Sequence, residues 1–268
     1  MLHHAKERTI PVSGGTMLCI SFGHGPCPLV ILPGLRFSSL KGTGLFLSLY
    51  YRKFTEIYTV YVFDRPAPVQ KGCTIHDLSE QTAEAMEALG IHGADIYAAS
   101  QGGMIAMDLA IHHPDLVHAM VLAVTASRAN PVLQDAIRTW IGLVERKDDA
   151  GLFRDYAERG YSEAYLRKYG KGLGFLLSLQ KCDDRERFAI LAESCLSANI
   201  YEKLGELRCP VLVLGGADDR IVSAEASREI AEKLHCPMYL YEGMSHEAYN
   251  EAPDFNARVY EFLRAGRI

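Results

Sequence analysis

A serine stands at an abrupt junction in the middle of the chain, where the sequence reads DIYAASQGGMIAMDLAIHH. The apolar residues before Ser100 have the length of a strand, and the residues after it favour a helix. A corner this tight needs small residues two positions before and after the serine, and here they are Ala98 and Gly102. This spacing is typical of a nucleophile elbow, usually G-x-S-x-G, which exposes a reactive hydroxyl above a sheet edge. The alternative is a serine that only caps the following helix.

A serine nucleophile needs a base and a group that orients the base, and the ends of two later strands supply candidates. The run PVLVLGG leads into Asp218 and Asp219, and the run PMYLYEG leads into His246. Sites in α/β proteins form at the edge of the sheet where parallel strands end. We therefore expect Ser100, one of the two aspartates and His246 to meet there and to attack a carbonyl group.

Runs of apolar, β-branched residues predict the strands that position these side chains. Their near-continuous apolar character indicates strands that are covered on both faces. The runs are 29–32, 57–63, 95–99, 120–124, 211–214 and 238–241. An edge hairpin is predicted from 9–11 and 17–22.

Helical segments alternate with these strands. Thr74 to Asp77 reads as a capping box, Ser223 can cap a helix, and 254–264 reads as a terminal helix. The alternation predicts a largely parallel α/β sheet of about eight strands with helices on its faces.

The alternation stops between residues 127 and 207. Asn130 and Pro131 are typical of a helix start, and apolar residues then recur at helical spacing. Further short helical pieces follow, and the glycine-rich run 170–174 is expected to be a hinge or loop among them. We therefore predict a core domain from 1–126 and 208–268, with a helical cap at 127–207 inserted between two strands.

The composition argues against several classes of function. A net charge of −5 leaves no basic surplus for binding nucleic acid, and no window is long and apolar enough to span a membrane. The charged start does not resemble a signal peptide. Seven scattered cysteines without a CxxC pair favour reduced thiols in a cytoplasmic protein. No motif for a metal or an organic cofactor is present, so neither is expected. The expected partner is a small-molecule substrate, with the protein a monomer or homodimer.

In their order along the chain, these features resemble the α/β-hydrolase fold with a helical cap, and the resemblance covers essentially the whole chain. The segments that carry it are LPGLR, FDRP, AASQGG, PVLVLGGADDRIV and GMSHEAYNEAPDF. The family order is serine, acid, histidine, and its G-x-x-D pattern implies that the acid is Asp219, with Asp218 as the alternative. The resemblance also implies an oxyanion hole formed by the backbone N–H groups of Leu35 and Gln101.

The chain departs from the family pattern in two places. Pro33 stands where histidine is usual, and 67–69 replace a glycine-rich stretch that normally follows the fourth strand.

We therefore expect a serine hydrolase that forms an acyl-enzyme and cleaves an ester, thioester or lactone of a small to medium, partly apolar substrate. Two alternatives stay open: hydrolysis or lysis of a carbon–carbon bond by the same residues, and a non-turnover receptor on the same fold. Arg36 and Trp140 are expected in the substrate pocket. Other apolar cap residues that could line it are Phe153, Phe175 and Leu176.

Overall fold

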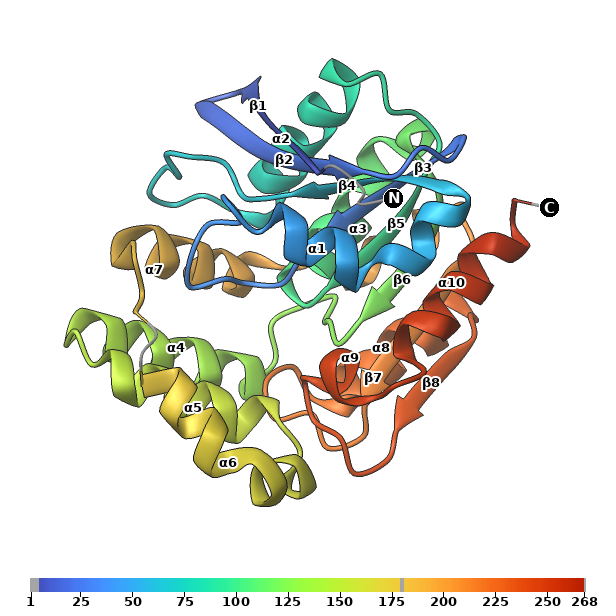
Figure 1. The fold of residues 1–268 in the computed structure, drawn as a ribbon. Helices are drawn as coiled ribbons and strands as arrows, with labels where there is room; N and C mark the ends of the chain where they lie inside the picture. Colours follow the sequence, from blue (N-terminus) through green and yellow to red (C-terminus); the bar gives the residue numbers. More distant parts are fainter. Residues whose placement is uncertain (1–4, 179–180, 268) are drawn as a thin grey trace.

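Eight strands form one twisted sheet in the order β1-β2-β4-β3-β5-β6-β7-β8 (Figure 1). The computed structural model describes residues 5–178 and 181–267. β1 pairs antiparallel with β2, and β2 pairs antiparallel with β4, whereas all later pairs are parallel. This sheet confirms the predicted α/β-hydrolase fold. Its strands are Lys6–Val12 (β1), Gly15–Phe22 (β2), Cys27–Leu32 (β3), Tyr58–Phe63 (β4), Ala94–Ala99 (β5), Val117–Ala123 (β6), Val211–Gly216 (β7) and Met238–Tyr241 (β8).

Helices cover both faces of the sheet, and successive strand residues pack against opposite layers. Val30 and Leu32 of β3 belong to the core cluster on the side of α2 and α3, whereas Leu29 and Ile31 belong to the cluster that includes Phe255. Figure 1 shows α1 and α10 on one face of the sheet and α2 and α3 on the other. These core helices are Gly44–Tyr50 (α1), Ile75–Ala88 (α2), Gln101–His112 (α3), Ala224–Leu234 (α8), Ala248–Glu251 (α9) and Phe255–Ala265 (α10), with the short 3-10 helices Arg52–Glu56 (η1) and Pro114–Leu116 (η2).

Side-chain caps fix several helix starts where the sequence predicts them. Thr74 and Asp77 form a complete capping box at α2. Asn130 accepts a hydrogen bond from the N–H of Leu133, and Ser223 accepts one from Ala226. Each cap satisfies an N–H group that the first helical turn would otherwise leave without a partner.

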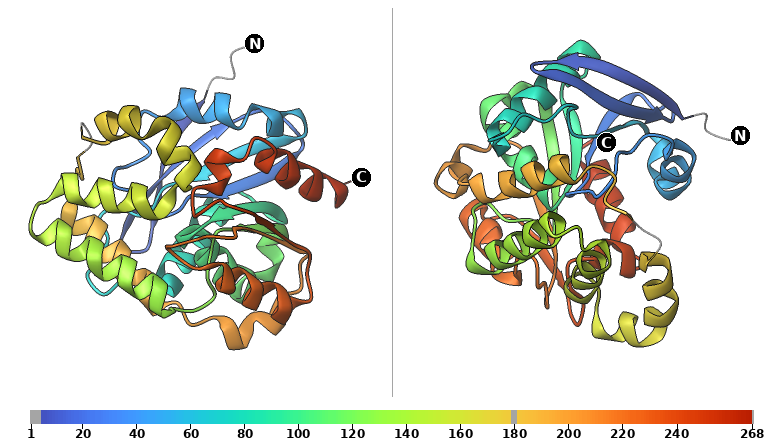
Figure 2. Two further views of the ribbon diagram at one scale, coloured as in Figure 1. Left: turned by 90° about the horizontal axis from the view of Figure 1, so that it is seen from below. Right: turned by 90° about the vertical axis from the view of Figure 1, so that its left-hand side faces the viewer.

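The insertion between β6 and β7 is helical, as predicted. Figures 1 and 2 show α4, α5 and α6 gathered at one side of the molecule. η4 instead contacts the core helices α3 and α8. The exact division of the chain into core and cap stays a prediction. The inserted elements are Pro131–Glu145 (α4), Asp149–Gly160 (α5), Glu163–Ser178 (α6), Arg185–Ser194 (α7), Cys195–Ser197 (η3) and Tyr201–Glu206 (η4).

The prediction that the glycine-rich run 170–174 is a hinge or loop is wrong, because these residues lie inside α6. A glycine costs about 0.5–1 kcal/mol relative to alanine inside a helix, which a favourable surrounding sequence can offset. Alanine, leucine and lysine residues elsewhere in this segment are good helix formers.

The structure bears on two predictions made from the sequence, the absence of a membrane span and the reduced state of the cysteines. Within residues 5–178 and 181–267, no helix combines the length and the apolar character that crossing a bilayer requires. All seven cysteines are free thiols. A cytoplasmic location stays a prediction.

The close approach of β3 to the start of α3 gives a test of the fold. A Cβ atom added at Gly102 would lie 2.0 Å from the carbonyl oxygen of Leu32, which is backbone and cannot move aside easily. We expect Gly102→Ala to lower the free energy of unfolding in urea by about 1–3 kcal/mol. Gly170→Ala in α6 is the matched control, because no atom lies within 4 Å of its added Cβ. A Gly102→Ala protein as stable as the wild type would refute this tight packing.

Candidate active site

Ser100 lies between β5 and α3 with φ of 52° and ψ of −121°, a conformation that non-glycine residues rarely adopt. Its N–H donates to the carbonyl of Ala123 at 2.9 Å, and its own carbonyl accepts from Thr125 Oγ1 at 2.7 Å. Unlike Thr74 or Ser223, Ser100 forms no side-chain capping hydrogen bond. The helix-cap alternative therefore does not fit this serine. Its hydroxyl does not bond to the N–H groups of the first turn of α3, so it is available for another role.

The small residues around Ser100 are needed for steric reasons. Besides the contact of Gly102 with Leu32, a Cβ at Gly103 would lie 2.6 Å from the side chain of Thr125. A Cβ at Gly34 would lie 3.1 Å from Cβ of Ser100 itself. The loop after β3 thus packs directly on the serine.

Asp219 and His246 form a buried pair at the ends of neighbouring parallel strands. Asp219 follows β7, His246 follows β8, and the carboxylate Oδ2 lies 2.8 Å from Nδ1 of the imidazole. The other carboxylate oxygen accepts the N–H groups of Ile221 and Val222 at 2.8 and 2.9 Å. Asp218 is exposed. The structure therefore brings Asp219, and not Asp218, to the histidine.

Electrostatics favour the protonated form of His246. Burial by itself lowers the pKa of His246, but the Asp219 carboxylate and its hydrogen bond, together with the charge of Glu247, outweigh that effect. The net result is a pKa above the ordinary value of 6.5. An imidazolium at this position is thus stabilised by the protein.

Ser100 and His246 line one small cavity of about 30 Å³, which has room for roughly one or two water molecules. No hydrogen bond joins their side chains in the described part of the chain. Catalytic hydrogen bonds are often long before a substrate binds. The other lining residues include Leu35, Met104, Trp140, Cys195 and Tyr249.

The two predicted oxyanion donors are available. Neither backbone N–H, that of Leu35 nor that of Gln101, donates a hydrogen bond to a described residue. Gln101 is the first residue of α3, where the helix dipole favours negative charge. Leu35 lines the cavity beside Ser100. Both N–H groups belong to residues next to the loop or corner that holds Ser100, so they remain candidates for binding an oxygen atom that gains charge.

A larger pocket of about 390 Å³ adjoins the small cavity, since both are lined by Leu35, Phe37, Tyr156 and Tyr249. Arg36, a predicted pocket residue, lines the larger pocket. Trp140, the other one, lines the small cavity, and its indole N–H donates to Asp155 at 2.8 Å. Six further aromatic side chains line the larger pocket: Phe46, Tyr50, Tyr51, Tyr97, Phe153 and Tyr161. The side chains of Phe175 and Leu176 lie outside the described residues.

Glu247 is a buried acid in this pocket that no sequence pattern pointed to. It is 2 % exposed and accepts hydrogen bonds from the hydroxyls of Tyr156 and Tyr249 and from the amide of Asn250. Burial and the nearby Glu247 charge hold the pKa of both tyrosines well above 10, so that they remain neutral donors. The pocket therefore carries a fixed negative charge one residue from His246.

The sequence patterns also did not predict a second buried network of polar side chains, although the FDRP motif contains two of its members, Asp64 and Arg65. Arg65 Nε donates to the side-chain oxygen of Gln101 at 2.8 Å, and its guanidinium also donates to the carbonyl of Pro33. The Gln101 amide in turn donates to the carbonyl of Leu191 in α7 at 2.6 Å. One arginine and one glutamine thus connect the loop after β3, the start of α3 and α7.

Asp64 extends the same network to the cap. It accepts the N–H of Leu40 at 2.8 Å and pairs with Arg187 of α7 at 3.0 Å. Burial opposes ionisation of Asp64, but the charge of Arg187 and the hydrogen bonds prevail, so its pKa lies below the ordinary value. α7 is thereby fixed to the core by an ion pair.

Comparisons with known proteins agree with this fold. The family model described as serine aminopeptidase, S33, matches residues 74–253, about two thirds of the chain. A protein of Caulobacter sp. strain K31 named for carbamate hydrolysis, RutD, is 25% identical over 240 residues, which cover 84% of this chain and 88% of that protein. The 3-oxoadipate enol-lactonase 1 of Acinetobacter baylyi is 20% identical, over 76% of this chain and 77% of its own.

Among solved structures, an α/β-hydrolase enzyme, MGS-M2, from a Medee basin deep-sea metagenome library superposes with a TM-score of 0.84. It is 19% identical and covers 96% of this chain and 97% of its own. Together the extent of the family match and the shared fold show that this chain belongs to the serine aminopeptidase S33 family of α/β-fold hydrolase enzymes.

Proposed function

We propose that this hydrolase cleaves an ester, thioester or lactone of a small to medium, partly apolar substrate by way of a covalent acyl-enzyme. One observation carries the proposal. Ser100 is held at positive φ, and its hydroxyl forms no capping hydrogen bond. It shares a cavity with His246, which is hydrogen-bonded to the buried Asp219. A nucleophile, a base and an orienting acid are the groups that acyl transfer by serine requires.

In this mechanism, His246 Nε2 takes the Ser100 proton as Oγ bonds to the substrate carbonyl carbon. The N–H groups of Leu35 and Gln101 receive the oxyanion, and Asp219 stabilises the imidazolium through Nδ1. The imidazolium then gives the proton to the leaving oxygen or sulfur, whose bond to carbon breaks. Water attacks the acyl-enzyme with His246 as base, which releases the acid and restores Ser100.

The pocket supports the substrate class. Its aromatic wall favours an apolar acyl or alcohol portion, and its volume of about 390 Å³ is that of a small-molecule site. Relatives are named for a carbamate, an enol-lactone and a phenyl-substituted dienoate as substrates. These names share hydrolysis and differ in substrate, so they support the class of reaction and leave the bond cleaved to experiment.

A fluorophosphonate probe tests the nucleophile. We expect one adduct per chain, located on Ser100 by peptide mass spectrometry, because only an activated serine hydroxyl reacts rapidly. Ser100→Ala should lose the adduct while keeping the wild-type circular dichroism spectrum, and protein unfolded by heat should not react. Folded wild-type protein that stays unlabelled would refute the proposal. A panel of p-nitrophenyl esters of increasing acyl length would then define the acyl group preferred.

Two adjacent acids provide a matched test of the orienting group. Asp219→Asn should lower kcat by about three to four orders of magnitude on the best ester, because the amide no longer holds the imidazole in the required tautomer. Asp218→Asn makes the same chemical change on an exposed neighbour, and we expect its kcat to stay within about twofold of wild type. The reverse ranking would transfer the role to Asp218.

The pH dependence of kcat/KM tests the electrostatic part of the site. His246 must be neutral to accept a proton, so activity should fall as the pH drops through its pKa, which lies above the ordinary 6.5. Glu247→Gln removes one of the charges that raise this pKa and should move the acidic limb to lower pH. Glu242→Gln is the control, since Glu242 is exposed. Equal shifts in the two variants would contradict this assignment.

A further inference from the structure

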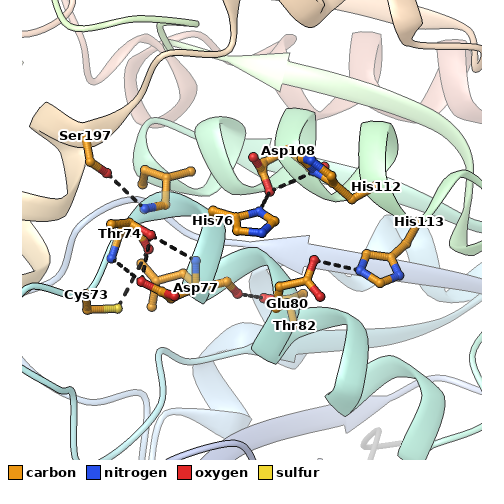
Figure 3. Close-up of polar contacts among 12 residues, drawn as sticks. Cys73, Thr74, His76, Asp77, Glu80, Thr82, Asp108, His112, His113 and Ser197 are labelled. Atoms are coloured by element: carbon orange, nitrogen blue, oxygen red, sulfur yellow. Dashed lines mark hydrogen bonds and ion pairs between the residues drawn. The ribbon is translucent and has the colours of Figure 1, made fainter.

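Three side chains capable of binding a metal ion meet between α2 and α3, the helices that cover one face of the sheet (Figure 3). They lie outside the site described above. His76 lies in the first turn of α2, while Asp108 and His112 lie one turn apart near the end of α3. One candidate ligand atom from each residue lies within 4.8 Å of the other two. Two ligands four residues apart on a helix present their atoms on one face, which suits a shared ion.

The distances from the Asp108 carboxylate to the two imidazoles match those between ligands of one ion. Oδ1 of Asp108 lies 2.9 Å from Nδ1 of His76 and 3.3 Å from Nδ1 of His112. Two atoms that are each about 2.1 Å from a metal are about 3.0 Å apart at a right angle and about 3.4 Å apart at a tetrahedral angle. The two pairs that include Asp108 therefore already lie at distances suited to a single ion, and the three candidate atoms lie within 4.8 Å of one another.

The charge around the cluster favours a cation. The Asp108 side chain is 11% exposed, and its ion-pair partners among the described residues are the two imidazoles. The hydrogen bond to Asp108 raises the pKa of His76, and the charges of Glu80 and Asp77 raise it further, although burial opposes them. The buried Asp108 carboxylate beside two imidazoles therefore suits a bound cation.

The cluster is open to solvent on one side. A groove of about 320 Å³ leads to it, lined by His76, Asp108 and His112 together with Thr74, Ser197, Asn199 and Lys203. Water molecules in this groove could complete a coordination shell that has three protein ligands. Lys203 also lines the groove, and its positive charge opposes metal binding.

We propose that His76, Asp108 and His112 bind a divalent transition-metal ion, with Zn²⁺ as the expected ion, and that this ion fastens α2 to α3. Two imidazoles and one carboxylate are a ligand set that Zn²⁺, Co²⁺, Ni²⁺ and Cu²⁺ accept, whereas Mg²⁺ and Ca²⁺ prefer oxygen ligands alone. The helical rise of 1.5 Å per residue puts Asp108 about 12 Å along α3 from Ser100. The ion therefore stabilises the helix pair and takes no part in the reaction of Ser100.

Binding requires that ring nitrogens lose or move their hydrogens. Nδ1 of a neutral His76 can pass its hydrogen to Nε2, which forms no hydrogen bond within the described residues. His112 gives up its contact with the carbonyl of Asp108, at 2.9 Å, if its Nδ1 is the ligand. Because protons compete for the same nitrogens, the affinity should fall at low pH.

The test uses the full chain without an affinity tag, after treatment with a chelator and its removal. Calorimetric titration with ZnCl₂ should show one ion per chain, and the melting temperature should rise by about 5–10 °C at a Zn²⁺ concentration 100-fold above Kd. MgCl₂ at the same concentration should leave the melting temperature unchanged. His76→Gln should weaken Zn²⁺ binding at least tenfold, and because His76 is largely exposed this variant should still fold.

The control variant is His113→Gln, which removes the neighbouring imidazole that pairs with Glu80 at 2.8 Å and should bind Zn²⁺ like the wild type (Figure 3). With CoCl₂, the visible spectrum should show nitrogen and oxygen ligation without a thiolate charge-transfer band, which separates this site from the free cysteines. Zn²⁺ affinity that is equal in His76→Gln and wild type, a thiolate band, or no saturable binding at about 100 μM would each overturn the proposal. None of these results depends on the activity of Ser100.

Discussion

The backbone at Ser100 is the constraint on which the rest of the site depends. A residue with a side chain is held at φ of 52° between a buried strand and a buried helix, which costs of order 1–3 kcal/mol unless its surroundings determine it. Those surroundings are the hydrogen bonds of Ser100 with Ala123 and Thr125, and the bare backbone of Gly102 against Leu32. Three neighbouring strands, β3, β5 and β6, must therefore be in register before the hydroxyl is exposed.

The same corner is connected to the cap through buried polar groups. Gln101 follows Ser100, and its side chain links Arg65 of the core to the backbone of α7. Loss of one member of such a network leaves the remaining groups buried without partners, which costs more than the net worth of any single hydrogen bond. α7 and the start of α3 are thus connected through one residue. A displacement of α7 would therefore be transmitted to the oxyanion donors.

Patterns of residue type were sufficient to predict the sheet and the starts of α2, α4, α8 and α10, and they pointed to Asp219 and His246, which the structure brings into contact. Such patterns report burial and local backbone preference, which strands and caps largely follow. They failed for the run 170–174. Its three glycines led to the prediction of a hinge or loop, but the helix-forming residues around them keep the run within α6. They also gave no sign of Glu247 or of the pairing between Asp64 and Arg187, because both depend on contacts between elements far apart in the chain.

Glu247 shows why such contacts matter for the proposed chemistry. As Ser100 loses its proton, positive charge appears on His246 and negative charge on the substrate oxygen. The positive charge is stabilised by the Asp219 carboxylate, 2.8 Å from Nδ1, and by the charge of the buried Glu247, the next residue in the chain. In the proposed mechanism, the N–H groups of Leu35 and Gln101 and the positive end of the dipole of α3 stabilise the negative charge. Because these groups are fixed by packing before substrate arrives, they need little reorganisation when the charges separate, and this is the condition under which electrostatic stabilisation lowers a barrier most.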